Sequence, residues 1–339
     1  MRLVVDGYGK SLGKRDNQIV VKDKGHEVNY FLAEELSQVI ITGKGSVSFD
    51  AMNLMATNNV DLVVLNWTGD IIYRLSPPEL KNVRGRREQF HAYNDSRSGF
   101  LCKQFIGAKM ENQKSVLGSL AKSRDYKNPG LSSEILKSRD RISDFLDKIH
   151  NLENKPIDEL RGKIFGLEGQ ASIEYWKGVS KVVNPNFGFF NRSGRGATDG
   201  VNSMLNYGYG ILRGYVWRSV HLAALDPYAG YLHADRWGRA SLVFDLIEEF
   251  RQQVVDRTVL SLVNLGKVKP SQFHMEGEMC LMSDKVRLLL ISSTLDKMDR
   301  KIKVDGKSIS WAELINHQAQ LLTKYLVGET QYTGFYQRW

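Results

Sequence analysis

The sequence predicts an α+β protein in which a small, mostly β domain precedes a larger all-α domain. Residues 1–78 contain short runs of alternating apolar and polar residues separated by turn signals. Ser76-Pro77-Pro78 then interrupts the pattern, because proline cannot donate to a strand ladder and restricts the residue before it. From about residue 87 the apolar residues recur with helical periodicity. We therefore expect domains at 1–78 and 87–339, joined by a linker at 79–86.

Within the first domain, turn signals separate the expected strands, which cover residues 2–5, 18–22, 28–31 and 39–42. The segments Asp6-Gly7-Tyr8-Gly9 and Asp23-Lys24-Gly25 are typical of turns. Residues 48–59 suit an amphipathic helix with Ser48 as its cap. Two further strands, at 61–65 and 71–74, are expected to pair with each other.

The second domain is predicted to be helical because prolines are sparse and plausible caps stand near the helix starts. The candidate helices cover residues 87–124, 132–149, 156–181, 199–225, 240–265, 283–297 and 308–327. Residues 184–199 are rich in Gly, Asn, Arg and Ser and form the longest expected loop in this half.

The composition is typical of a folded protein of the reducing cytoplasm. Hydrophobic residues make up 42% and charged residues 25% of 339 residues, enough for a sizeable core without covalent staples. Cys102 and Cys280 stand far apart, so neither a disulfide framework nor a cysteine zinc site is expected. We expect no signal peptide and no membrane span. The net charge of +9 makes a polyanion, and nucleic acid above all, the natural partner.

A first candidate for chemistry is Glu168, which stands among apolar residues and between Gly166 and Gly169. Two helical glycines indicate close approach of another backbone or of a ligand. A carboxylate among apolar neighbours needs a partner, which could be a metal ion or the cation of a structural salt bridge. This segment alone favours the salt bridge.

The other candidates are His233, which follows a helix stop at Leu225-Asp226-Pro227, and three acids, Asp245, Glu248 and Glu249. A lone histidine is usually a satisfied core or surface residue. The acids stand at i, i+3 and i+4, so a regular helix projects them to one side, with Arg251 able to pair with Glu248. They suit either a cation site or a charged solvent face, and the solvent face is the commoner case.

Together these residues offer one imidazole and several carboxylates on separate segments. Oxygen-rich sites with few nitrogens suit Mg²⁺ or Mn²⁺ better than structural zinc. Three protein ligands leave room for water and a phosphate oxygen, and such an ion activates phosphodiester chemistry. With a net-positive chain, phosphodiester chemistry is the coherent choice, although spacing by itself does not prove it.

At these residues the chain resembles the CRISPR-associated endonuclease and integrase family of spacer adaptation, the universal first Cas protein. Three stretches carry the resemblance, and they occur in the family's order over nearly the whole chain. They are Phe165-Gly166-Leu167-Glu168-Gly169 with Tyr175, the helix of Asn202 with Tyr207-Gly208-Tyr209, and the run from Leu225-Asp226-Pro227 through Tyr231-Leu232-His233 to Asp245 and Glu248.

The resemblance implies that Glu168, His233 and Glu248 bind Mg²⁺ or Mn²⁺, with Asp245 as an auxiliary acid. It implies that the 3′-hydroxyl of a protospacer DNA attacks a phosphodiester at the leader–repeat junction, and that His233 could also help proton transfer. It further implies a homodimer through the β domains, and a heterohexamer with the small second adaptation protein.

Basic residues near these segments are candidate phosphate contacts. The segment with Arg84, Arg86 and Arg87 suits a solvated linker or a DNA-binding surface, and a second group could bind phosphates close to the site: Lys181, Arg192 and Arg195.

Two other functions remain open on the sequence. A general metal-dependent nuclease that acts on branched DNA in repair shares every feature of the site. A non-catalytic scaffold would use only the basic surface.

Overall fold

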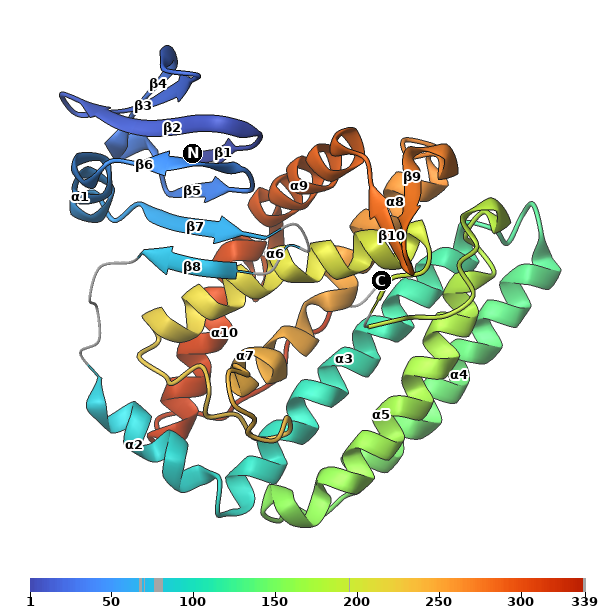
Figure 1. Ribbon diagram of the computed structural model, residues 1–339. Coiled ribbons are helices and arrows are strands. Elements are labelled where there is room, and N and C mark those ends of the chain that lie inside the picture. Colours follow the sequence, from blue (N-terminus) through green and yellow to red (C-terminus); the bar gives the residue numbers. More distant parts are fainter. Residues whose placement is uncertain (67–68, 70, 76–81, 195, 338–339) are drawn as a thin grey trace. The chain divides into compact units, whose positions relative to one another are not determined.

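The computed structural model describes residues 1–66, 69, 71–75, 82–194 and 196–337. The chain divides into two compact units, Met1–Glu79 and Leu80–Trp339. Strands predominate in the first unit and helices in the second (Figure 1), so the predicted α+β class is confirmed. Residues 76–81, which hold the expected boundary and the start of the expected linker, lie outside the described residues. The rest of that linker is helical from Val83, where α2 (Val83–Ala92) begins.

The N-terminal unit contains two four-stranded sheets. In the first, three parallel strands are followed by one antiparallel strand, in the order β1 (Arg2–Val5), β5 (Gln38–Ile41), β7 (Asp61–Leu65) and β8 (Ile71–Leu75). The order in the second is β4 (His26–Leu32), β3 (Gln18–Asp23), β2 (Tyr8–Arg15) and β6 (Lys44–Val47).

Most of these strands match the sequence predictions, including the antiparallel pairing of 61–65 with 71–74. Two strands were not predicted. The sequence of β2, YGKSLGKR, holds two glycines and no β-branched residue, and only Leu12 is buried in it. The sequence of β6, KGSV, is as poor in strand formers, and β2 begins at Tyr8, within the segment expected to be a turn.

The predicted helix of this unit is α1 (Phe49–Thr57), and Ser48 caps it by accepting a hydrogen bond from the Ala51 N–H at 3.2 Å. This helix packs against strands of both sheets. Its buried Met55 joins Leu3, Ile19 and Leu62 in one hydrophobic core.

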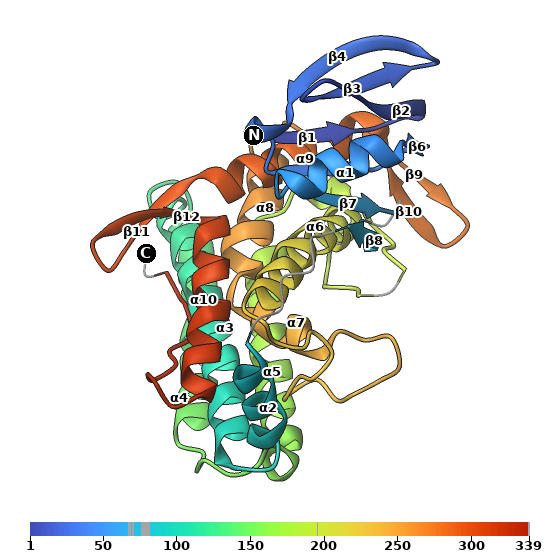
Figure 2. The ribbon, with the colours of Figure 1, turned by 90° about the vertical axis from the view of Figure 1, so that its left-hand side faces the viewer.

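The second unit is built around the long helix α3 (Ser96–Lys122), against which α4 (Pro129–His150) and α5 (Ile157–Ser180) pack. The remaining long helices, which Figure 2 also shows, are α6 (Gly200–Leu222), α9 (Asp284–Asp299) and α10 (Trp311–Leu326), and α10 packs against α6 and α9. None of the helices in the described ranges is long and apolar enough to cross a membrane.

Two predicted helices are broken in the structure. The helix expected at 87–124 divides into α2 and α3, because Asp95 caps a new helix by accepting from the Arg97 N–H at 2.8 Å. The helix expected at 240–265 consists of four pieces, which are α7 (Ser241–Leu246), a 3₁₀ turn (Ile247–Glu249), a π-helical turn (Gln252–Asp256) and α8 (Arg257–Asn264). This break determines where the acids of the segment point.

Two short hairpins, which the sequence did not predict, accompany the helices. They pair β9 (Phe273–Glu276) with β10 (Met279–Met282) and β11 (Lys301–Val304) with β12 (Lys307–Ser310).

Candidate active site

Helix α5 presents Glu168 to α3. Its Oε1 lies 2.5 Å from Nζ of Lys109 on α3 and accepts a hydrogen bond of 2.9 Å from Ser172, one turn further along α5. The Glu168 side chain is 20% exposed, so it lies at the edge of the solvent rather than in the core. An ion pair therefore partners this carboxylate, as the salt-bridge alternative expected.

The second carboxylate is Glu248, in the 3₁₀ turn after α7. Its Oε2 lies 2.8 Å from Nζ of Lys109, and its Oε1 lies 3.0 Å from Nε of Arg251. Burial opposes the charge, but Arg251, Lys109 and His233 together lower the pKa of Glu248 to about 2. Glu168 and Glu248, from segments far apart in the sequence, thus converge on one ammonium group.

His233 lies near enough to Glu248 to lower the pKa of that carboxyl, and Asp245 holds the imidazole in place. Asp245 is fully buried at the end of α7 and accepts hydrogen bonds from the backbone N–H groups of Tyr231, Leu232 and His233 at 2.6, 3.1 and 3.0 Å. Its Oδ1 also lies 2.7 Å from Nδ1 of His233. An imidazole that donates from Nδ1 to a carboxylate keeps its Nε2 lone pair available to a ligand.

The three acids of this segment do not form a common cluster. Asp245, Glu248 and Glu249 are all buried, so the interpretation as a charged solvent face is wrong. They also have separate partners, because the helix changes to a 3₁₀ turn after Leu246 and the regular i, i+3, i+4 alignment is lost. Glu249 turns away from the site.

Glu249 binds the C-terminal segment. It accepts hydrogen bonds from Tyr332 Oη at 2.5 Å, from Gln318 Nε2 at 2.9 Å and from the Phe335 N–H at 2.9 Å. Burial nevertheless raises its pKa to about 7. Glu249 therefore holds Tyr332 and Phe335 of the C-terminal segment against the 3₁₀ turn that also carries Glu248.

The side chains of Glu168, Glu248 and His233 are ligands that suit a divalent cation. Their present arrangement is not that of a metal site, because a lysine side chain lies among them. Among the described residues, no three His, Cys, Asp or Glu side chains are grouped so that they could hold a metal ion as they stand. The cause is visible in the contacts, because Lys109 lies between Glu168 and Glu248. Glu248 Oε2 is buried and already lies 2.8 Å from a cation, the Lys109 ammonium, so this oxygen suits a positively charged ligand.

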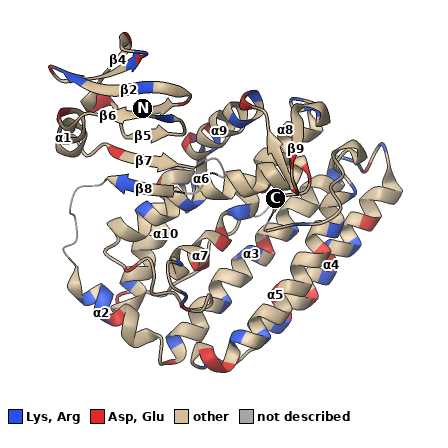
Figure 3. Ribbon diagram, in the orientation of Figure 1, with Lys and Arg blue, Asp and Glu red and all other residues tan. Residues whose placement is uncertain are grey.

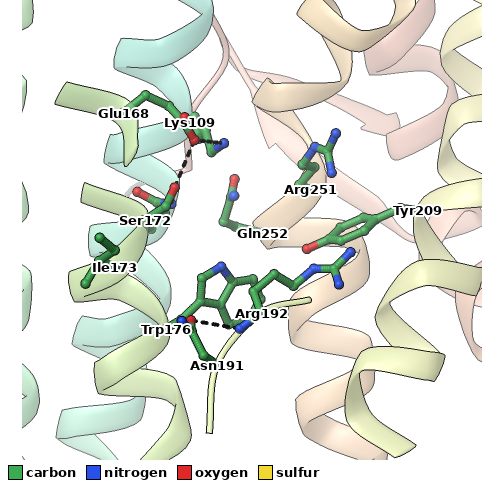
Figure 4. A pocket seen from close by; sticks show the side chains of 11 residues that line it. Lys109, Glu168, Ser172, Ile173, Trp176, Asn191, Arg192, Tyr209, Arg251 and Gln252 are labelled. Atoms are coloured by element: carbon green, nitrogen blue, oxygen red, sulfur yellow. Dashed lines mark hydrogen bonds and ion pairs between the residues drawn. The ribbon is translucent and has the colours of Figure 1, made fainter. Parts of the chain in front are cut away.

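A cavity of about 330 Å³ opens beside Lys109 and Glu168. Figure 4 shows Arg192 and Arg251 on either side of the Tyr209 ring, with Trp176 and Ile173 on the opposite wall. The guanidinium carbons lie 5.2 Å and 4.7 Å from the ring centroid. The cavity thus combines positive charge with aromatic surface.

Buried Asp256 holds the Tyr209 side chain of this cavity in position. It accepts hydrogen bonds from Tyr175 Oη at 2.8 Å and Tyr209 Oη at 2.5 Å. Burial raises the pKa of Asp256 to about 6, although both tyrosines oppose the rise. The carboxylate therefore fixes the ring on which the two arginines stack.

The structure describes five of the six basic residues predicted to bind phosphates. Of these five, only Arg192 lines the cavity, where it donates to Asn202 and Asn206 and where burial lowers its pKa. Lys181 pairs with Glu134, and Arg84 donates to the Val327 carbonyl at 3.2 Å. The basic residues of α2, Arg84, Arg86 and Arg87, lie close together on that helix (Figure 3). Arg195 lies outside the described residues.

Gly166 and Gly169 are not sites of close packing. A Cβ atom at either position would meet no atom of the described chain within 4 Å. The sequence suggested that these glycines allow close approach of either another backbone or a ligand. In the described part of the structure, no other backbone of this chain approaches them. The space in front of this face of α5 is open to a ligand.

The sequence interpretation missed Lys109. Its signal was a single lysine in the run Phe105-Ile106-Gly107-Ala108-Lys109-Met110, in which every other residue is apolar or glycine. A charge within such a run needs a buried partner, but the sequence does not say which acid supplies it.

Comparison with solved structures finds the same fold in a casposase and in a Cas1 protein. A casposase bound to an integration product has a TM-score of 0.84 and 26% identity over 98% of this chain and 92% of that one. A Cas1 protein from Thermotoga maritima has a TM-score of 0.77 and covers 99% of this chain and 100% of that one; at 21% identity it supports the fold alone. The fold is that of a class of proteins that contains this casposase and the Cas1 proteins.

The chain belongs to the Cas1 family. Residues 3–294 match the family described as CRISPR associated protein Cas1. A protein of Archaeoglobus fulgidus named CRISPR-associated endonuclease Cas1 1 is 43% identical over the full length of both chains. A protein of Methanobrevibacter ruminantium named CRISPR-associated protein Cas1 3 is 36% identical, also over both full lengths. The resemblance seen in the sequence motifs is confirmed.

Proposed function

We propose that this protein is a metal-dependent DNA endonuclease and integrase that inserts protospacer DNA into a CRISPR array. One observation carries the proposal, namely the convergence of Glu168 and Glu248 on a single cationic position with His233 close enough to lower the pKa of Glu248. Membership of the Cas1 family, with relatives named as endonucleases, supports it.

In this proposal Glu168, Glu248 and Nε2 of His233 hold Mg²⁺ or Mn²⁺. Two carboxylates and one imidazole suit these ions and leave positions for water and phosphate oxygens. When bound, the ion polarises the phosphodiester and lowers the pKa of the attacking water or 3′-hydroxyl. Asp245 keeps the Nδ1 proton of His233 and thereby fixes the orientation of the ring.

The positive residues around the cavity bind and orient the DNA backbone. Arg192 lines the cavity, and Arg251 lies between Glu248 and Tyr209. Their guanidinium groups suit the oxygens of a phosphate that passes over the site. Fixed donors of this kind stabilise the extra negative charge of the pentacoordinate phosphate.

A strand-transfer assay tests the proposal. Protospacer DNA and a repeat-containing plasmid are incubated with Mn²⁺ or Mg²⁺ and with the wild type, Glu168→Gln, His233→Ala or Glu248→Gln. We expect each variant to lose at least about a hundredfold in rate. The matched control is Glu153→Gln, which changes a glutamate that is 81% exposed and should leave the rate unchanged. Retention of integration by His233→Ala would contradict the proposal.

The same assay distinguishes the two other functions. A repair nuclease of branched DNA would cut Holliday junctions and flaps but would show no preference for the leader–repeat junction. A non-catalytic scaffold would bind DNA, and Glu168→Gln would leave every measured property intact.

We also propose partner proteins for this chain, because the family that it resembles forms assemblies. We expect a homodimer formed by the N-terminal units, and two such dimers around a dimer of the small second adaptation protein. Light scattering of the protein alone, and after mixing with that partner, tests both assemblies.

A further inference from the structure

Lys109 occupies the point at which the two proposed metal ligands meet. It extends from the middle of α3, and its side chain is only 12% exposed. Its Nζ touches Glu168 Oε1 at 2.5 Å and Glu248 Oε2 at 2.8 Å. A divalent ion bound by these two carboxylates would need the volume that the ammonium group fills.

The charges of the site are already balanced without an ion. Glu168 and Glu248 carry two negative charges, and Lys109 and Arg251 carry two positive charges in contact with them. A divalent ion added beside an unmoved ammonium would place like charges within a few ångströms, at a high electrostatic cost. The ion and the ammonium therefore exclude each other.

The adjoining cavity contains a second place for the ammonium. Gln113 stands four residues after Lys109 on α3, so the two side chains leave the same face of the helix. Gln113 and Gln252 both line the cavity and are both almost fully buried. Their Oε1 atoms accept no hydrogen bond from any described residue. Buried acceptors without donors are costly, and an ammonium group that reached either oxygen would remove that cost.

We propose that Lys109 is an internal competitor of the metal ion, which binds Glu168 and Glu248 in the metal-free protein and moves toward Gln113 and Gln252 when the ion binds. The inference rests on the proposed function, because it takes Glu168 and Glu248 as the metal ligands. In its second position the ammonium lies in the cavity beside Arg192, where it meets a DNA phosphate. Metal binding and phosphate binding then strengthen each other.

The first test measures the affinity for Mn²⁺ by electron paramagnetic resonance in the full-length protein without DNA. Lys109→Met should bind Mn²⁺ about tenfold or more tightly than the wild type, because no ammonium has to be displaced. Lys114→Met is the matched control, since Lys114 is on the same helix and pairs with Glu111 away from the site. Its affinity should equal that of the wild type. Equal affinity of Lys109→Met and the wild type would overturn the inference.

A double-mutant cycle tests the second position of the ammonium. Gln113→Met removes an acceptor and should weaken Mn²⁺ binding in the wild type, because the displaced ammonium loses a partner. In the Lys109→Met background the same change should have no effect. An equal effect in both backgrounds would refute the movement toward Gln113. Lys109→Gln, which keeps a polar group, replaces Lys109→Met if thermal melting shows that the latter does not fold.

A third measurement compares Mn²⁺ affinity with and without a short DNA duplex. The duplex should tighten Mn²⁺ binding more in the wild type than in Lys109→Met, and equal tightening in both would contradict the coupling.

Glu168→Ala separates failure of this inference from failure of the proposed function. If Glu168→Ala binds Mn²⁺ as the wild type does, the metal site itself is wrong. If it loses Mn²⁺ while Lys109→Met equals the wild type, only the inference about Lys109 fails.

Discussion

Nδ1 of His233 lies 2.7 Å from Oδ1 of Asp245, and the same carboxylate accepts the backbone N–H groups of residues 231 to 233. Asp245 therefore holds both the imidazole and the backbone that carries it. All four interactions use a fully buried group, so Asp245 has no freedom to turn toward a metal ion. The sequence left Asp245 and Glu248 as rivals for the third ligand, and this geometry favours Glu248.

Asp245→Asn should impair the site without removing a ligand. The new amide NH₂ would face N–H groups that now donate to the carboxylate, which leaves buried donors without an acceptor and costs about 1–3 kcal/mol of stability. The imidazole also loses the partner that fixes its tautomer, so integration should fall by about 10- to 100-fold. Urea unfolding and initial rates measure the two effects. Asp235→Asn, an exposed change in the loop after His233, should alter neither.

Gly166→Ala and Gly169→Ala should stabilise the protein yet reduce its activity. A Cβ at either position of α5 meets nothing in the described chain, and alanine is favoured over glycine within a helix by about 1 kcal/mol. If DNA approaches this open face beside Glu168, the added methyl groups interfere with it. Thermal melting should therefore show a higher midpoint, and DNA titration a weaker affinity.

Gly162→Ala is the control for these two variants. Gly162 also lies in α5 with open space around it, but one to two turns before Glu168. It should gain the same stability and bind DNA as the wild type does. Unchanged DNA binding by all three variants would show that the glycines of the motif have no role in substrate approach.

Tyr332→Phe should loosen the C-terminal segment from the active-site turn. Tyr332 donates to Glu249 at 2.5 Å, and Glu249 is adjacent in sequence to Glu248. Loss of one donor to a buried carboxylate costs about 1–3 kcal/mol. Urea unfolding should show this loss. Tyr325→Phe is a suitable comparison, because Tyr325 is only half-buried and stacks on Phe100, and it should cost less.

The sequence predicted those features that depend on local patterns. The long helices, six of the eight strands of the first unit and the Ser48 cap all follow from periodicity and capping residues. The role of Lys109 could not be predicted, because its partners stand 59 and 139 positions further along the chain. The separate directions of Asp245, Glu248 and Glu249 depend on the break in the helix after Leu246, which tertiary contacts impose on a sequence of helical period.

Asp256 should make the stability depend on pH in a direction opposite to that of most acids. Burial raises its folded pKa to about 6 from an ordinary value of 3.8, so between these values the folded state binds a proton that the unfolded state has lost. The free energy of unfolding should therefore fall as pH rises from about 4 to 6, by up to roughly 3 kcal/mol, and level off above that range. Asp256→Asn keeps the shape but cannot ionise, so its stability should lack this decline.

Urea unfolding of the wild type and Asp256→Asn at several pH values between 4 and 7 measures the effect. The difference between the two proteins isolates Asp256 from the other acids, including Glu249, whose raised pKa acts in the same direction at slightly higher pH. Asp140→Asn changes an exposed acid and should run parallel to the wild type. Parallel curves for the wild type and Asp256→Asn would mean that Tyr175 and Tyr209 stabilise the charged carboxylate well enough to cancel the effect of burial.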